Sequence, residues 1–296
     1  MADETKRETE QDDGIKREKV RVVPLSAVKD FPNHPFQVKD DDSMQELIHS
    51  IEVNGVLNPV IARKTEQGDY ELISGHRRKH ACVVLGIERI PIIVREISRD
   101  EAVIAMVDSN LQRENILPSE RAFAYKMKYD VLKRNVGRPK SGQAVQIIPK
   151  GKSTLQAIGE EGGDSQKQVQ RYLRITFLIP ELLTKLDEGA LAFNPAVDIS
   201  YLKETEQREM LSAMEYAQAS PSISQAQRIK ELSQKGKCTQ EKMQEILGEV
   251  KKGEITRVMF KNEQLYRYFP RTYTPAQMKR EIMSLLKINK EQYWEN

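Results

Sequence analysis

Cysteine and tryptophan are scarce in this chain. Its 296 residues include two cysteines, Cys82 and Cys238, and one tryptophan. The cysteines have no CxxC spacing, which excludes a disulfide framework and a cysteine-based zinc site, and we interpret both as packing or surface thiols. The four histidines form no HExxH or similar metal motif, so we predict no transition-metal site.

Long apolar runs are also missing. The mean hydropathy is -0.61, charged residues make up 31% of the chain, and no apolar run approaches the roughly 18 residues that a membrane span needs. The opening residues MADETKRETEQDD lack the apolar centre of a signal peptide. We therefore expect a cytoplasmic protein with no membrane partner.

The charge is unevenly distributed along the chain. The net charge is only +3, but the segment from Arg121 to Lys152 contains nine Lys or Arg against one acid, Asp130, a local excess of +8. Such a block attracts polyanions. The alternative is a solvated helix face followed by a linker.

The first part of the chain predicts a tail and then a mixed α/β domain. Residues 1–18 are polar and mixed in charge, so we expect a disordered tail, and we place the domain at 19–117. A helix is expected to begin at Ser43, with Glu46 at capping-box spacing, and to end near Gly55. Strands are expected in PVIAR, YELIS and IPIIVREI, with helices at HRRKHACVV and after Ser98.

Two polar segments of this domain contain residues suited to binding an anionic ligand. The first, ISGHRRKHA, places a glycine, two arginines and a helix start directly after a strand, an arrangement that holds anions. The second, SNLQREN, follows downstream and adds amide and arginine side chains. We predict that the two segments form a nucleotide pocket. The alternative for Arg77 and Arg78 is a surface pair on an amphipathic helix.

A helical domain is predicted over 118–235. A long helix begins at Pro118, and the glycine- and proline-containing segment 135–152 predicts a basic loop. Residues 153–175 have the sequence pattern of a helix-turn-helix, with small Gly159 where the helices approach and Gly162-Gly163 at the turn. An apolar residue is usual at the position of Gly162, so we expect the first helix to end early or to pack loosely.

The second helix of this pair predicts contacts with DNA. Gln and Lys side chains near the start of a recognition helix suit base edges, whereas Ser and Arg suit phosphates. Asp164 or Ser165 is expected to cap the helix. The alternative is an ordinary helical hairpin with a solvated face. The predicted base contacts are Gln166, Lys167, Gln168 and Gln170, and the predicted phosphate contacts are Ser165, Arg171 and Arg174.

The last part of the chain, residues 236–296, predicts a helical region that serves in dimerisation. ITRVMF alternates like a strand, and the final helix has an apolar face that a second copy could cover. That face consists of Met278, Ile282, Leu285 and Leu286.

The order of these segments resembles that of the ParB family of DNA partition proteins. NPVIARK, ISGHRRKHA, SNLQREN and QAIGEEGGDSQKQVQRYLRITFLIPELL are similar to the family's nucleotide motifs and helix-turn-helix, within a match from about residue 20 to 202. The resemblance implies an α+β fold. An N-terminal mixed α/β domain of the ParB and sulfiredoxin type precedes an all-α helix-turn-helix domain and a small C-terminal α/β unit.

The resemblance also implies a nucleotide switch. CTP with Mg2+ would close a homodimer into a clamp on a palindromic, centromere-like DNA site, with a ParA-type ATPase as partner and the nucleoid or a plasmid as location. Asn110 would help to hold the metal. The implied nucleotide-binding residues are Gly55, Gly75, His76, Arg77, Arg78, Asn110, Gln112, Arg113 and Glu114.

Three positions depart from the family pattern. His76 and Ser109 replace glutamates, and His80 replaces an arginine. Magnesium prefers carboxylate oxygens, so the sequence does not decide whether CTP is hydrolysed. Asp108 or Glu114 is the candidate to replace the missing carboxylates. The alternative is a transcriptional repressor with a vestigial pocket. A sulfiredoxin-like redox enzyme is not expected, because Gly75 stands where the reactive cysteine of those enzymes precedes a His-Arg pair.

Overall fold

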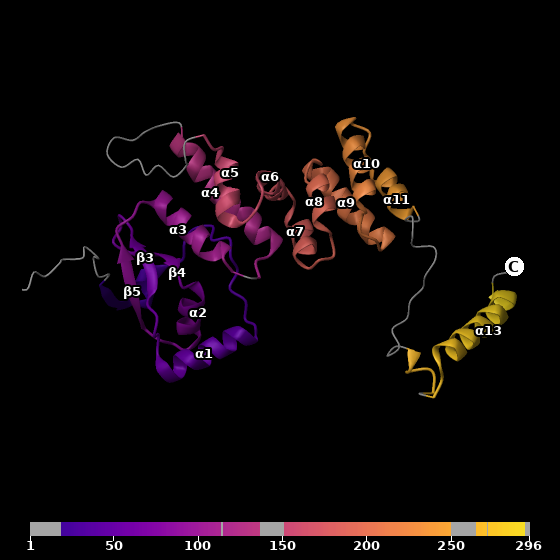
Figure 1. Cartoon of the computed structure of the whole chain (residues 1–296), viewed down its shortest axis with the longest axis horizontal. Helices are drawn as coiled ribbons and strands as arrows, with labels where there is room; N and C mark the ends of the chain where they lie inside the picture. The colour runs from indigo at the N-terminus through magenta and orange to yellow at the C-terminus, as the bar shows by residue number, and fades with distance from the viewer. Residues whose placement is uncertain (1–18, 114, 137–150, 250–264, 271, 294–296) are drawn as a thin grey trace, which may run out of the picture. The chain divides into compact units, whose positions relative to one another are not determined.

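The computed structural model describes residues 19–113, 115–136, 151–249, 265–270 and 272–293 (Figure 1). The chain divides into two compact units, Met1–Gly248 and Glu249–Asn296. The first unit joins a mixed sheet to a series of helices, which confirms the α+β class predicted from the sequence.

A five-stranded mixed sheet forms the start of the first unit (Figure 1). The strand order is β1-β5-β3-β4-β2. The strands predicted in PVIAR and YELIS pair antiparallel as β3 and β4, β5 runs parallel to β3, and β1 closes one edge antiparallel to β5. The strands are β1 (Val20–Pro24), β2 (Val28–Lys29), β3 (Val60–Lys64), β4 (Tyr70–Ser74) and β5 (Arg89–Arg95), with a 3-10 turn, η1 (Leu25–Ala27), between the first two.

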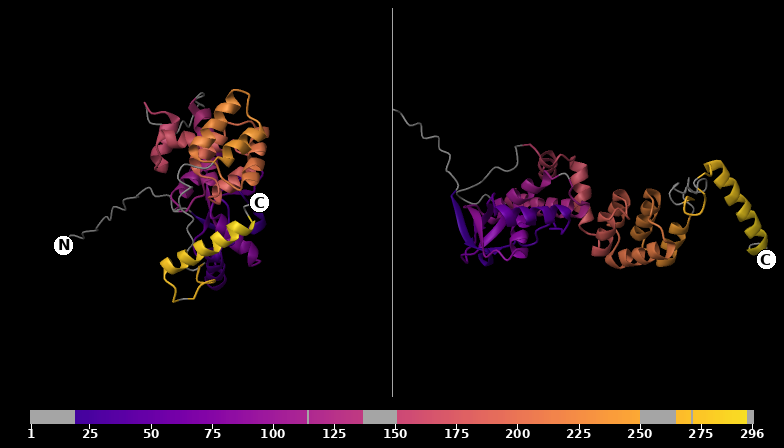
Figure 2. Two further views of the ribbon diagram at one scale, coloured as in Figure 1. Left: turned by 90° about the vertical axis from the view of Figure 1, so that its right-hand side faces the viewer. Right: turned by 90° about the horizontal axis from the view of Figure 1, so that it is seen from below.

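Helices α1 (Asp42–Asn54) and α2 (His76–Val84) cover this sheet (Figure 2, right). The capping role predicted for Ser43 is wrong, because α1 begins one residue earlier, at Asp42, and its N-cap is Asp41, whose carboxylate accepts a hydrogen bond from the Met44 amide at 2.9 Å. The predicted end is confirmed, since Gly55 follows Asn54 in a left-handed conformation with φ 70°. The capping box that opens α3 (Arg99–Leu111) is also confirmed.

A second core joins α3 to the helices that follow. Val103 and Met106 of α3 pack with Tyr125 of α4 (Pro118–Val136), Ile158 of α5 (Thr154–Gly162) and Val169 of α6 (Gln166–Ile175). This apolar core makes the sheet domain and the helix pair continuous parts of one unit.

One buried lysine strengthens this junction. Lys128 of α4 is 1% exposed, and its ammonium group pairs with Asp108 of α3 and Glu161 of α5. A buried charge needs such partners, because an unpaired ammonium group would lose its hydration without compensation. Lys128 therefore ties α3 and α5 to the same helix.

A third core closes the first unit, and its members extend to Leu247 of the last helix. The helices are α7 (Pro180–Asp187), α8 (Phe193–Ile199), α9 (Glu204–Ala217), α10 (Ile223–Gln234) and α11 (Gln240–Gly248).

The second unit is described mainly by α13 (Pro275–Tyr293). Met278 is buried, whereas Met283 and Leu286 are exposed. The strand predicted at 255–260 lies outside the described residues. Within the described ranges, every helix is too short or too polar to cross a lipid bilayer.

Candidate functional site

An open cavity of about 730 Å³ lies where the N-terminal ends of α1 and α2 meet the segment after α3. The structure brings three of the predicted nucleotide-binding residues into it, namely Arg77, Gln112 and Arg113. Its volume lies within the range of about 300–1,000 Å³ that is typical of small-molecule sites. The other lining residues are Gln37, Lys39, Asp41, Ser43, Asn115, Ile116, Leu117 and Glu120.

The N-terminal end of α1 holds Arg77 at the wall of this cavity. The Arg77 Nη2 donates a hydrogen bond to Ser43 Oγ at 2.7 Å and lies 3.9 Å from Asp41 Oδ1. The hydrogen bond from Ser43, with that from the Met44 amide, lowers the pKa of Asp41, so this carboxylate is ionised at neutral pH. The sequence reasoning missed Asp41 as a site residue and gave Ser43 only a capping role, although both flank a helix start.

Gly75 gives α2 its position at the cavity. It is the N-cap of α2 with φ 106°, and no side chain caps the first turn there. A Cβ atom at this position would lie 2.6 Å from Val60 Cγ1, so only glycine fits. The uncapped amide groups at the start of α2 are suited to an anion.

Other predicted site residues do not line the cavity. The Arg78 Nη1 donates to the carbonyl oxygens of Asn58 and Pro59 at 2.6 and 2.8 Å, and burial lowers its pKa. Arg78 thereby fixes the chain before β3. The Asn110 amide donates to the Met106 carbonyl at 2.8 Å, and Gly55 caps α1. Glu114 lies outside the described residues.

No cluster of three His, Cys, Asp or Glu side chains suited to a metal occurs within the described part of the chain. Asp108, one of the two carboxylates considered for magnesium, is paired with Lys128. The acidic side chains that line the cavity are Asp41 and Glu120. Glu120 is buried, and its oxygens accept hydrogen bonds from the Gln37 and Leu117 amides.

His76 turns away from the cavity lining and stacks on His34. Their ring centroids are 3.7 Å apart, and the Nε2 atoms of both rings are buried without a hydrogen-bond partner. Burial, followed by the neighbouring His34, lowers the pKa of His76 to about 3. His76 is therefore neutral at physiological pH and does not supply the carboxylate that it replaces in the family pattern.

The predicted helix pair is present as α5 and α6, which are joined by a short turn. Gly163, with φ 74°, caps α5, and the hydroxyl of Ser165 caps α6 by accepting a hydrogen bond from the Gln168 amide at 3.2 Å. A Cβ atom on Gly159 would lie 2.4 Å from the Asp164 carbonyl oxygen, which explains the small residue at this close approach.

The expectation of loose packing at Gly162 was wrong. A Cβ atom there would lie 2.3 Å from the hydroxyl of Tyr125, which is fully buried. That hydroxyl donates to Asp164 Oδ2 at 2.6 Å, so Tyr125 fills the space that an apolar residue occupies in other helix pairs. Asp164 is thereby used inside the protein and does not cap α6.

The predicted DNA-contacting side chains fall into two groups. Gln166, Lys167 and Gln170 are exposed on α6. In contrast, Arg171 donates to Gln168 and to Asn194 and lies over the Phe193 ring, 5.2 Å from its centroid.

Arg174 is also held within the protein. It donates to the Ser200 carbonyl oxygen and lies over the rings of Phe177 and Tyr201, at 4.7 and 4.0 Å from their centroids. The first half of α6 thus offers free polar groups, and the second half is built into the fold.

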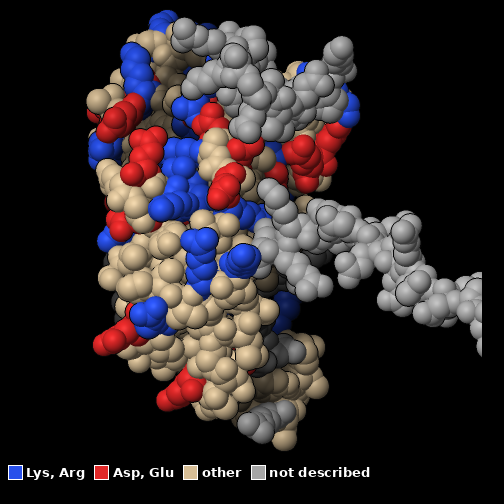
Figure 3. All heavy atoms as spheres, turned by 90° about the vertical axis from the view of Figure 1, so that its left-hand side faces the viewer, with Lys and Arg blue, Asp and Glu red and all other residues tan. Residues whose placement is uncertain are grey.

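The basic block from Arg121 to Lys152 is neutralised more than its sequence suggests. Among the described residues, its cations pair with acids from other elements, including Arg121 with Asp164 at 3.0 Å and Arg134 with Asp100 at 3.1 Å. Counting charge along the chain omits such partners. Figure 3 accordingly shows Lys and Arg side chains interspersed with Asp and Glu on the upper part of one face, above a lower part with few charges.

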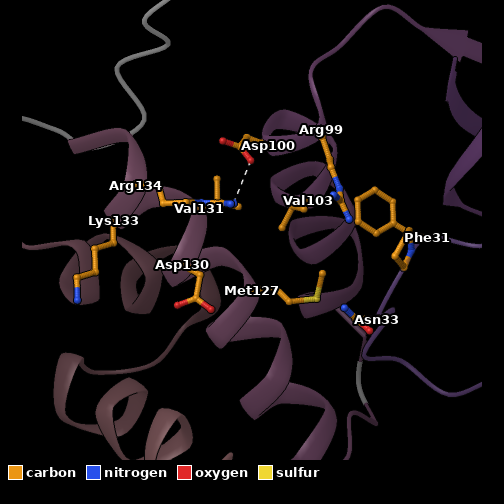
Figure 4. A pocket seen from close by; sticks show the side chains of 11 residues that line it. Phe31, Asn33, Arg99, Asp100, Val103, Met127, Asp130, Val131, Lys133 and Arg134 are labelled. Atoms are coloured by element: carbon orange, nitrogen blue, oxygen red, sulfur yellow. Dashed lines mark hydrogen bonds and ion pairs between the residues drawn. The ribbon is translucent and has the colours of Figure 1, made fainter. Parts of the chain in front are cut away.

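A second cavity of about 560 Å³ lies between α3 and α4 (Figure 4). Phe31, Val103 and Met127 form its apolar side, and the Arg134–Asp100 ion pair crosses its rim (Figure 4). None of the predicted nucleotide-binding residues lines it. The cavity at α1 and α2 is therefore the better candidate for an anionic ligand.

The fold and site define a protein whose N-terminal α/β domain carries a cation-lined cavity and is followed by the helix pair α5–α6. A profile of the ParB N-terminal domain matches residues 9–111. The nucleoid occlusion protein of Listeria innocua is 32% identical over 256 residues, which cover 85% of this chain and 78% of that protein. The chain belongs to the ParB family.

Two solved structures of C-terminally truncated chromosome-partitioning protein ParB from Caulobacter crescentus are also similar. The one complexed to the centromeric parS site is 21% identical, with a TM-score of 0.39, and covers 73% of this chain and 99% of that one. The one complexed with CTP-gamma-S is 24% identical, with a TM-score of 0.30, and covers 63% of this chain and 94% of that one.

Proposed function

We propose that this chain is a DNA-binding partition protein that uses CTP as a switch. The observation that carries the proposal is the meeting of Arg77 with Gln112 and Arg113 in one cavity, although they come from separate parts of the sequence. Two arginines, with Lys39, beside the uncapped start of α2 provide the positive environment that a triphosphate requires. Membership of the ParB family supports CTP as that triphosphate.

Duplex DNA is the proposed partner of α6. Its exposed Gln166, Lys167 and Gln170 can donate and accept hydrogen bonds at base edges in the major groove. A helix-turn-helix dimer reads two half-sites, so a palindromic site and a homodimer belong to the same proposal. The apolar side chains of α13 are the proposed dimer contact, and a ParA-type ATPase is the proposed protein partner.

Calorimetric titration with CTP tests the switch. The wild-type chain is expected to bind CTP at tens of micromolar or better. Arg77→Ala is expected to weaken binding at least 30-fold, the scale of a lost hydrogen bond between charged groups of about 2 kcal/mol. Arg21→Ala, at an exposed site on β1 outside the cavity, is the matched control. Equal CTP binding by the Arg77 and Arg21 variants would remove Arg77 from the site.

Magnesium is proposed to act through the nucleotide phosphates, with Asp41 as the carboxylate that lines the cavity. A titration of CTP with and without Mg2+ on Asp41→Asn checks this, since the variant is expected to lose the benefit of the metal. Phosphate release measured on the same samples decides whether CTP is hydrolysed. Absence of turnover would favour a binding switch.

A second candidate function is nucleoid occlusion, which is favoured by the 32% identity to the Listeria innocua protein over most of both chains. A third, a repressor with a vestigial pocket, is favoured by the neutral His76. Mapping the chain on the chromosome in cells separates these functions. One cluster of sites predicts partition, widely dispersed sites predict occlusion, and promoter sites that are unaffected by CTP predict repression.

A further inference from the structure

A series of cation–aromatic contacts crosses the helical part of the first unit. Arg174 at the end of α6 lies between the rings of Phe177 and Tyr201, 4.7 and 4.0 Å from their centroids. Each ring also has a lysine over it. Lys126 of α4 lies 5.9 Å from the Phe177 centroid, and Lys230 of α10 lies 3.9 Å from the Tyr201 centroid. We name this set of five side chains the cation–aromatic ladder.

The ladder is exposed to solvent at both of its rings. Phe177 is 59% exposed and Tyr201 is 46% exposed, which is unusual for large rings that lie next to an apolar core. The cations of the ladder lie over these rings, and the remaining surface of both rings faces solvent. Apolar packing within the chain does not account for these exposed surfaces.

The ladder carries an excess of positive charge. Lys126 pairs with Asp130 at 3.7 Å and Lys230 pairs with Asp198 at 2.9 Å, whereas Arg174 donates to a neutral carbonyl oxygen. The Nε of Arg174 is buried without a hydrogen-bond partner. Three cations and two paired acids leave one positive charge, and the side chains of Lys126 and Lys230 are 44% and 25% exposed.

The position of the ladder relates it to the recognition helix. Arg174 is on α6, and Phe177 follows directly after that helix ends at Ile175. The ten residues of α6 span about 15 Å at 1.5 Å per residue, and the major groove is about 12 Å wide. With the start of α6 at the bases, its far end lies at the sugar-phosphate backbone that bounds the groove.

We propose that the cation–aromatic ladder binds the sugar-phosphate backbone of duplex DNA at the edge of the groove that α6 enters. Phe177 and Tyr201 pack against deoxyribose, and Lys126 and Lys230 approach phosphates on either side of Arg174. This inference rests on the proposed DNA-binding function and adds a sequence-independent surface to it. When DNA is bound, Lys126 and Lys230 exchange their partners Asp130 and Asp198 for phosphate.

Fluorescence anisotropy of the full chain with a random-sequence 40-base-pair duplex over a salt series tests the ladder. Lys126→Gln/Lys230→Gln is expected to lower the slope of log affinity against log salt by about 2, because each lost phosphate contact removes about 0.9. The affinity at low salt is expected to fall about tenfold. The matched control is Lys235→Gln/Lys242→Gln, which removes two exposed cations of α10 and α11 outside the ladder.

A second pair of variants tests the rings. Phe177→Leu/Tyr201→Leu is expected to weaken duplex binding three- to tenfold, whereas Tyr216→Leu, at a ring that is 76% exposed on α9, is expected to leave it unchanged. Urea unfolding of every variant separates lost contacts from lost folding. Lys126→Gln/Lys230→Gln leaves both rings in place. If the ring variant unfolds, the lysine variant therefore still tests the ladder.

The outcomes separate the inference from the function on which it rests. If the wild-type chain binds duplex DNA and the lysine variant matches its control, the ladder inference is overturned and the recognition helix stands. If Phe177→Leu/Tyr201→Leu weakens binding of a single-stranded 40-mer but not of the duplex, the rings stack on bases. The assignment of the ladder to duplex DNA is then overturned. If the wild-type chain binds no duplex at all, both proposals fail together.

Discussion

The cavity and α6 both contain arginines that the sequence predicts as ligand contacts, but their surroundings in the structure differ. Arg77 and Arg113 line an open cavity, where a ligand can reach them. Arg171 and Arg174 are already engaged with Asn194 and with the Ser200 carbonyl oxygen. Arg77 also has a partner, the Ser43 hydroxyl, but both lie at an open cavity, whereas Arg174 is bonded to the main chain of a neighbouring helical segment. A ligand therefore needs an open cavity at the arginine, and a motif alone does not provide one.

The largest effect is expected at the glycine that positions the cavity. Gly75→Ala should reduce the free energy of unfolding by about 3 kcal/mol, because it combines a left-handed conformation with overpacking against Val60. Gly163→Ala, at a position that is also left-handed (φ 74°, ψ 17°) but has open space around it, should cost about 1 kcal/mol. Urea unfolding measures both, and equal losses would show that the contact with Val60 is relieved without cost.

Arg174→Ala should destabilise the fold by about 2 kcal/mol, because it removes a hydrogen bond to Ser200 and stacking on two rings. Arg77→Ala should change stability by less than about 1 kcal/mol, because its main described contact is the Ser43 hydroxyl at the cavity edge. Urea midpoints of the two variants test the contrast directly. A stable Arg174 variant would indicate that this arginine acts mainly on a ligand.

Acid should weaken the cavity domain through His76. Its pKa is lowered in the folded chain to about 3, so the unfolded chain binds more protons below about pH 6.5, and stability falls as the pH falls. The loss is at most about 1.4 kcal/mol per pH unit. Between pH 7.5 and 5.5, the free energy of unfolding should fall by about 1 kcal/mol less in His76→Gln than in the wild type. An unchanged pH dependence would mean that His76 is charged or solvated.

The smallest effect on the fold is expected at Lys167. Lys167→Ala should leave stability within about 0.5 kcal/mol of wild type, because this side chain is exposed. It should lower the salt slope of DNA binding by about 1 if Lys167 contacts a phosphate, and change sequence preference if it contacts a base. No change in either property would remove Lys167 from the DNA interface.

Local sequence signals predicted the secondary structure near the site well. The strands β3 and β4, the α3 capping box and the helix pair α5–α6 all follow from short-range patterns in the sequence. The contribution of Asp41 to the cavity was not predictable in the same way. It depends on a contact between Arg77 and the start of α1, which are distant in sequence.

The predictions made from the charge count and from Gly162 failed for the same reason. Described cations of the +8 block from Arg121 to Lys152 pair with acids from α3, α5 and the turn after α5, which a count along the chain cannot include. Gly162 was expected to leave α5 loosely packed, but the Tyr125 hydroxyl from another helix occupies that space. In both cases the missing information was which helices become neighbours in three dimensions.

The buried Lys128 has a practical consequence for dividing this protein. A fragment that ends before α4 would keep Asp108 but lose its cation, and would leave Val103 and Met106 of α3 facing water. A fragment that begins at α4 would keep Lys128 without Asp108, next to an uncovered apolar surface. The sheet domain and the helix pair should therefore be expressed together, and a cut is better placed after Gly248, where the first compact unit ends.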